Sequence, residues 1–128
     1  MQQFRQAIEK RDLKALMSLF TEDVVFRSPV TYHPFEGRQQ VETVLTGVMH
    51  VLEDFRYTRA IGDPQAADSA LVFEARVGDR DVEGCDFIHV NEDGLIDELY
   101  VMFRPLSGVM AMAGAMKRQL GLDTPSAA

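Results

Sequence analysis

The sequence predicts an α+β fold, in which helices cover one face of a curved, mostly antiparallel sheet. Apolar residues recur with helical spacing up to residue 52, and with the alternation of β-strands from residue 55 onward. The sequence Asn91-Glu92-Asp93-Gly94 separates two strand-like stretches and suits the left-handed backbone of a hairpin loop. Helices first and strands last are typical of a layered α+β domain.

The first half of the chain is predicted to contain three helices and one short strand. Phe4 and Ile8 give the apolar stripe of a first helix. Asp12 then caps a second helix, whose apolar residues are Leu13, Leu16, Met17 and Phe20. Val24–Arg27 follows as a strand, and two prolines make the segment Ser28–Gly37 a loop. The longest helix is Arg38–Leu52, with valines and leucines along one side.

The second half is predicted to be a four-stranded antiparallel meander followed by a helix. The strands are Phe55–Ile61, Leu71–Val77, Val82–Val90 and Leu95–Phe103. A Met-, Ala- and Gly-rich helix follows at Leu106–Leu120, where Gly121 can cap its end. We therefore expect one domain over residues 1–122 and a disordered tail over residues 123–128.

Composition limits the function. The net charge of −7 argues against nucleic acid or an anionic membrane as a partner, since both favour an excess of Lys and Arg. No apolar run approaches the length needed to span a bilayer. The single Cys85 excludes an internal disulfide, and no residues have the spacing of a metal site, so a cytoplasmic protein is expected.

Asp86 is the candidate functional residue. Its strand neighbours at alternate positions are Gly84, Ile88 and Val90, so its carboxyl group is expected on an apolar face. A register that places Asp86 opposite Leu99 gives this face five further apolar residues: Leu71, Phe73, Ala75, Val101 and Phe103. Desolvation there would raise the pKa of the carboxyl group, as a general acid or base requires. The alternative is a structural carboxylate, hydrogen-bonded across the pocket to a Tyr, His or Arg.

The chain resembles the SnoaL-like branch of the NTF2-like superfamily in three segments: DLKALMSLFTEDVVFRSP (12–29), FEGR (35–38) and residues 84–105. The resemblance implies a cone-shaped pocket between the curved sheet and the helices, and chemistry without a cofactor. It also implies that Asp86 matches the strand carboxylate of ketosteroid isomerase, limonene epoxide hydrolase and the polyketide cyclases. The other catalytic positions differ. The isomerase's tyrosine and aspartate base fall on Phe4 and Ser28, and the hydrolase's arginine and second aspartate fall on Gly84 and Val101.

Other candidates are weaker. Tyr32 and His33 lie in the loop expected to border the pocket mouth, where they would assist Asp86 or simply be solvated. Arg104 would anchor an anionic substrate group or form a surface ion pair. The expected ligand-binding residues are Leu71, Phe73, Leu99, Val101, Phe103 and Arg104. Met110, Met112 and Met116 would form a lid over the pocket or pack as core.

Three functions fit these observations: a small cofactor-independent enzyme that moves a proton on a hydrophobic molecule, a ligand-binding module without catalysis, and an interaction scaffold. The enzyme would be of isomerase, cyclase or hydrolase type. A homodimer is also expected, because the sheet face opposite the pocket mixes apolar groups with both charge signs. The residues on that face are Val72, Glu74, Arg76, Glu83, Cys85, Phe87, His89, Tyr100 and Met102.

Overall fold

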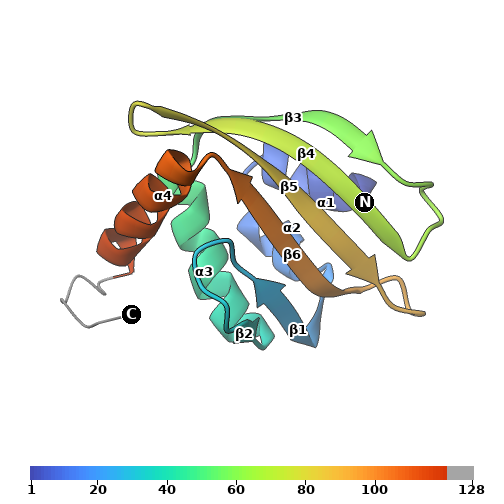
Figure 1. Cartoon of the computed structure of the whole chain (residues 1–128). Helices are drawn as coiled ribbons and strands as arrows, with labels where there is room; N and C mark the ends of the chain where they lie inside the picture. The colour runs from blue at the N-terminus through green and yellow to red at the C-terminus, as the bar shows by residue number, and fades with distance from the viewer. Residues whose placement is uncertain (121–128) are drawn as a thin grey trace.

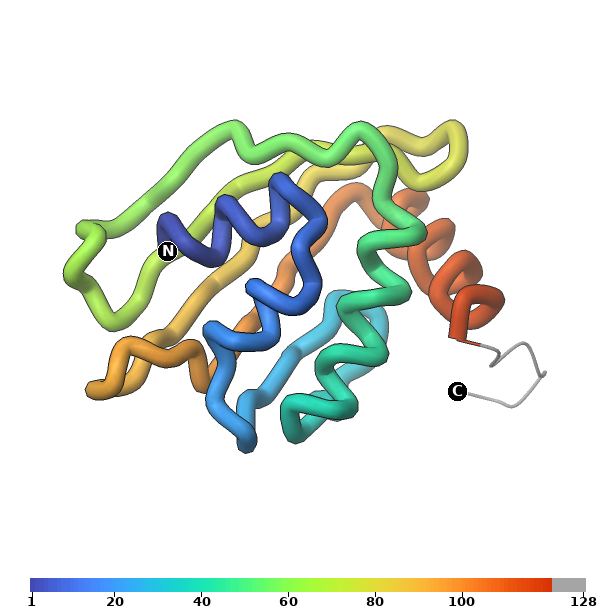
Figure 2. Tube along the Cα trace, turned by 180° about the vertical axis from the view of Figure 1, so that it is seen from behind, coloured from blue at the N-terminus to red at the C-terminus, as the bar shows by residue number. Residues whose placement is uncertain are grey.

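A computed structural model describes residues 1–120 and shows helices on one face of a six-stranded curved sheet (Figures 1 and 2). The helices are α1 (Gln2–Glu9), α2 (Leu13–Met17), α3 (Arg38–Val51) and α4 (Leu106–Gln119). The strands are β1 (Phe20–Arg27), β2 (Phe35–Glu36), β3 (Glu53–Ile61), β4 (Asp68–Val77), β5 (Arg80–Val90) and β6 (Ile96–Arg104). The predicted α+β class is confirmed.

The strand order is β2-β1-β6-β5-β4-β3, so the predicted meander forms four neighbouring strands. Strand β1 adds to it by pairing in parallel with β6. In Figure 2 the helices α1, α2 and α3 lie in front of the sheet, with α4 beyond α3 at one end. The predicted cap at Gly121 and the tail 123–128 lie outside the described residues. No helix within residues 1–120 has the length and apolar character needed to cross a membrane.

The second helix ends earlier than predicted. Asp12 caps it as expected, accepting a hydrogen bond from the Ala15 N–H at 3.1 Å. The helix stops at Met17, however, and Phe20 begins β1 opposite Ile96. Phe20 is fully buried there. A single apolar residue fits helical and strand spacing equally well, and the parallel pairing with β6 decides its conformation.

The predicted register of the central hairpin is wrong by two residues, since Asp86 lies opposite Val101 and not Leu99. Two features of the hairpin account for this shift of two residues. The turn closes between Asn91 and Leu95, with Gly94 at a φ of 79°. A β-bulge between Ile96 and Glu98 then accommodates Asp97 as an extra residue. A shift of two residues leaves every side chain on its predicted face, so Asp86 still points toward the helices.

Candidate active site

A cavity of about 350 Å³ lies between the sheet and the helices α1, α3 and α4. Its wall is mainly aliphatic and aromatic, and it includes four of the predicted ligand-binding residues: Phe73, Leu99, Val101 and Phe103. Leu71 is fully buried in the protein core and does not line the cavity. The helical residues Met112 and Met116 also line the cavity, whereas Met110 is mostly exposed.

Asp86 is the one acidic residue in this wall, among the described residues. Only 7% of its surface is exposed, and its neighbours across β4 and β6 are the apolar Leu71 and Val101. The phenol Oη of Tyr57 donates a hydrogen bond to Asp86 Oδ2 at 2.9 Å. The other carboxyl oxygen has no protein hydrogen-bond partner within residues 1–120. Asp86 therefore has one oxygen held by the protein and one free for a ligand.

Tyr57 reaches Asp86 from two strands away, because β4 lies between β3 and β5. Phe73 on β4 pairs with Tyr57 on one side and with Gly84 on the other. The missing side chain of Gly84 makes room for the Phe73 ring, since a Cβ atom there would collide with that ring and lie 2.8 Å from the Met102 carbonyl oxygen. Phe55 packs against both rings, with centroids 4.9 Å from Tyr57 and 4.8 Å from Phe73. This aromatic cluster holds the phenol in place.

Burial in this apolar wall raises the pKa of Asp86 to about 7, even though the hydrogen bond from Tyr57 acts to lower it. Burial also raises the pKa of Tyr57, and the nearby Asp86 charge raises it further, so the phenol remains a neutral donor. At neutral pH the carboxyl group therefore populates both of its protonation states. It can release a proton into the cavity or accept one from it.

The structure does not bring Tyr32 and His33 to Asp86. Residues 28–31 of their loop line the cavity as expected, but Tyr32 is 94% exposed, His33 is exposed, and neither lies in the wall. The two rings pack against each other, with centroids 6.1 Å apart. The loop borders the cavity, but it has no periodicity from which the direction of these side chains follows. Among the described residues, the side chain that donates to Asp86 is Tyr57 instead, and the assisting role expected for Tyr32 and His33 has no contact with Asp86 behind it.

From the sequence, a Tyr, His or Arg is expected to bond Asp86 if its role is structural, but Tyr57 is not identified as that tyrosine. A signal was present, because Phe55 and Tyr57 alternate with the charged or polar Arg56 and Thr58. That alternation marks Tyr57 as facing inward, and a buried phenol needs a hydrogen-bond partner.

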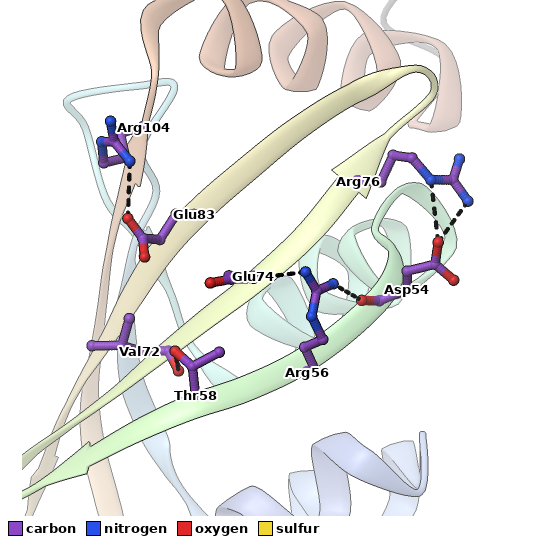
Figure 3. Close-up of polar contacts among 8 residues, drawn as sticks. All are labelled: Asp54, Arg56, Thr58, Val72, Glu74, Arg76, Glu83 and Arg104. Atoms are coloured by element: carbon purple, nitrogen blue, oxygen red, sulfur yellow. Dashed lines mark hydrogen bonds and ion pairs between the residues drawn. The ribbon is translucent and has the colours of Figure 1, made fainter.

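Arg104 lies outside the cavity, on the opposite face of the sheet, where its Nη1 donates to Glu83 Oε1 at 3.0 Å (Figure 3). The same face carries ion pairs from Arg56 to Glu74 and from Arg76 to Asp54. Arg104 therefore forms the surface ion pair that was the alternative to ligand binding. Within residues 1–120 no group of His, Cys, Asp or Glu side chains is arranged to hold a metal ion.

Fold and cavity together define a small α+β protein whose curved sheet and helices enclose an apolar chamber with one buried acid. Residues 1–99 match the SnoaL-like domain. The chain therefore belongs to the SnoaL-like family, within the NTF2-like superfamily.

Two solved structures are similar to nearly the whole chain. A crystal structure described as a steroid delta-isomerase from Pseudomonas aeruginosa is 39% identical, covers 93% of this chain and 87% of its own, and has a TM-score of 0.87. An uncharacterised protein with a cystatin-like fold from Silicibacter pomeroyi is 36% identical, covers 95% of this chain and 85% of its own, and has a TM-score of 0.89.

A more distant structure, the epoxide hydrolase/cyclase-like enzyme SalBIII, is 17% identical. It covers 82% of this chain and 87% of its own, with a TM-score of 0.66, and it supports the fold alone. No curated protein matches the chain.

Proposed function

We propose that this protein is a cofactor-independent enzyme that transfers a proton on a hydrophobic small molecule bound in the cavity. The observation that carries the proposal is the Asp86 carboxyl group, buried in an apolar wall with a pKa of about 7 and one oxygen free. A structural carboxylate would have several donors and a depressed pKa. Asp86 has one donor within the described residues, and its pKa is displaced in the opposite direction.

Asp86 acts as the acid or base in this scheme. As a carboxylate, it takes a proton from a carbon next to the substrate carbonyl and becomes a neutral acid. It then returns the proton to the same carbon or, where the enolate is conjugated with a double bond, to the γ-carbon, and the carboxylate is regenerated. Tyr57 stays bonded to Oδ2 throughout and fixes the orientation of the carboxyl group. The apolar wall excludes water, which keeps the proton between Asp86 and the substrate.

The similarity to the Pseudomonas aeruginosa protein supports an isomerase-type reaction. The positions Phe4 and Ser28, which carry a tyrosine and a base in ketosteroid isomerase, cannot contribute to proton transfer here. Asp86 must therefore perform both proton steps. We place this activity in the cytoplasm, supported by the free thiol of Cys85.

Hydrogen–deuterium exchange on a simple ketone tests the proposal, because it requires only a bound molecule with acidic α-protons. 2-Tetralone is a compact apolar ketone of this kind, and its exchange in D₂O can be followed by ¹H NMR. The protein is expected to accelerate exchange above the buffer rate. The pH profile of this acceleration should show the titration of a group with a pKa near 7, and Asp86→Asn is expected to abolish the acceleration. The matched control is Asp97→Asn. It also removes one carboxylate, but at the contact of Asp97 with His89 on the outer face of the sheet.

The main alternative is a binding module without catalysis, favoured by the missing groups at Phe4 and Ser28. Tetralone that binds with no acceleration in the wild-type protein, or acceleration that survives in Asp86→Asn, would contradict the proposed enzyme.

A further inference from the structure

Apart from Asp86, the charged side chains in the otherwise apolar cavity wall are cations. Within residues 1–120, its charged side chains are Arg11, Asp86 and Lys117. This is unexpected in a protein with a net charge of −7. An apolar ligand would leave these cations without a function in the cavity.

Arg11 marks the rim of the cavity. Along this side of the wall, Phe4 is 1% exposed, Ile8 is half-buried and Arg11 is exposed, so the depth decreases from Phe4 to Arg11. Lys117 occupies a comparable place on α4, where it is exposed next to the buried Met116. A molecule with its apolar body among the phenylalanines would therefore have a polar end at the rim.

The Arg11 guanidinium is held in a fixed position. Its Nη1 and Nη2 donate to the carbonyl oxygens of Met49 and Leu52, at 2.5 and 3.1 Å, where α3 ends. The backbone of Arg11 has a φ of 54°, a left-handed conformation that few residues other than glycine adopt. Helix-end carbonyls orient the guanidinium, but they carry only a fraction of a charge. The cation is thus positioned in advance and is not neutralised.

No carboxylate within residues 1–120 lies within ion-pair distance of Arg11. The ion-paired arginines each have at least one carboxylate partner, as Arg5 has Glu9 and Arg104 has Glu83. Neither Arg5 nor Arg104 lines the cavity. Arg11 therefore keeps hydrogen-bond donors and a full charge for a ligand that enters the cavity.

We propose that the molecule bound in this cavity is an amphipathic carboxylate, whose apolar body fills the chamber and whose anionic end is bound by Arg11. Lys117, exposed on α4, contributes a second cation. This inference rests on the proposed function, because it describes the substrate of the same site. Arg11 determines specificity and takes no part in the proton transfer. Arg104, the anion-binding candidate from the sequence, is replaced in this role by Arg11.

Two matched probes test the inference: 2-naphthylacetate and its neutral amide, which have nearly the same shape. Calorimetric titration at pH 6 and low salt keeps the acid ionised while Asp86 is largely protonated. The wild-type protein is expected to bind the acid about tenfold more tightly than the amide, a typical ratio for one charge-assisted contact. Added salt should reduce that ratio, because the contact is exposed at the rim.

The variants separate the role of Arg11 from general effects of charge. Arg11→Gln is expected to bring the ratio of the two dissociation constants close to one while leaving the amide affinity unchanged. Arg11→Lys should keep part of the preference. Arg104→Gln changes the net charge by the same amount on the other face of the sheet and should leave the ratio intact. If Arg11→Gln fails to fold because α3 loses its contact, Arg11→Lys and Lys117→Gln still report the rim charge.

A wild-type ratio near one, no binding of the acid, or a ratio unchanged in Arg11→Gln would overturn the inference. Tetralone exchange is independent of Arg11, so exchange without acid preference rejects the inference and keeps the proposed enzyme. Acid preference without exchange supports the inference as a binding property and rejects the enzyme.

Discussion

Replacing Asp86 by Asn tests the charge state of the site through protein stability. The folded pKa of about 7 lies above the ordinary value of 3.8, so the folded protein binds this proton more tightly than the unfolded chain. Below pH 4 both states hold the proton, and the group costs no stability. As the pH rises from 4 to 7, the carboxyl group ionises in the unfolded chain but not yet in the folded protein. This ionisation lowers the free energy of the unfolded state alone, so the free energy of unfolding falls. Above pH 7 the loss is constant.

The size of the effect follows from the two pKa values. A difference of about three units corresponds to about 4 kcal/mol at high pH, at roughly 1.4 kcal/mol for each unit. Most of this develops between pH 5 and 8, where the loss grows by about 2–3 kcal/mol. Asn cannot ionise, so Asp86→Asn avoids the loss. Its buried amide has a cost of its own, about 1–3 kcal/mol, but that cost does not change with pH.

Urea unfolding of both proteins at pH 5, 6, 7 and 8 measures the difference directly. Other titrating groups, including His89, are common to both proteins and cancel. The free energy of unfolding of the Asn variant should gain on the wild type by about 2–3 kcal/mol across this range. A difference that stays constant would show that Asp86 has the same pKa in both states. If the free energy of unfolding of the Asn variant instead falls relative to the wild type as the pH rises, folding stabilises the carboxylate, and the reasoning is refuted.

Three further predictions follow from the same structure. Tyr57→Phe removes the hydrogen bond that lowers the pKa of Asp86, so the pH dependence of tetralone exchange should move to higher pH; an unmoved profile would contradict the contact. Gly84→Ala forces a Cβ atom against Phe73 and the Met102 carbonyl oxygen and should reduce the free energy of unfolding by about 1–3 kcal/mol. The control Gly114→Ala should cause no such loss, because its Cβ atom meets only Arg118 at 3.6 Å. Equal melting temperatures of the two variants would count against the packing of Phe73 over Gly84. A homodimer through the outer sheet face, where Phe87 and Met102 are 41% and 51% exposed, should appear in sedimentation at micromolar concentration and be weakened by Met102→Arg; a wild-type monomer would reject it.

The sequence identifies Asp86 because side-chain direction in a strand depends only on whether a position is odd or even. The two-residue error in register leaves that direction unchanged, so the buried acid is located despite the missed bulge at Asp97. Tyr57 is different, because its contact crosses the intervening strand β4 and depends on the space above Gly84. Such a contact has no local pattern in the sequence.

Loops and turns account for the other differences. Part of the segment 28–37 lines the cavity as predicted, but nothing in its sequence determines the outward direction of Tyr32 and His33. Arg11 lies in the short connection between α1 and α2, where its role depends on carbonyl oxygens 38 and 41 residues away in the chain. Arg104 lies at the end of a strand, as predicted, yet strand alternation with Glu83 puts it on the outer face.

The measurement that tests the central claim most directly is a titration of Asp86 itself. Selective ¹³C labelling of the aspartate carboxyl carbons allows each one to be followed by NMR between pH 3 and 9, and the spectrum of Asp86→Asn assigns the Asp86 signal by its absence. The proposed acid–base role predicts a midpoint near pH 7 for this signal. A midpoint at or below about 4, the ordinary aspartate value, would show a permanently ionised carboxylate and contradict proton transfer by Asp86.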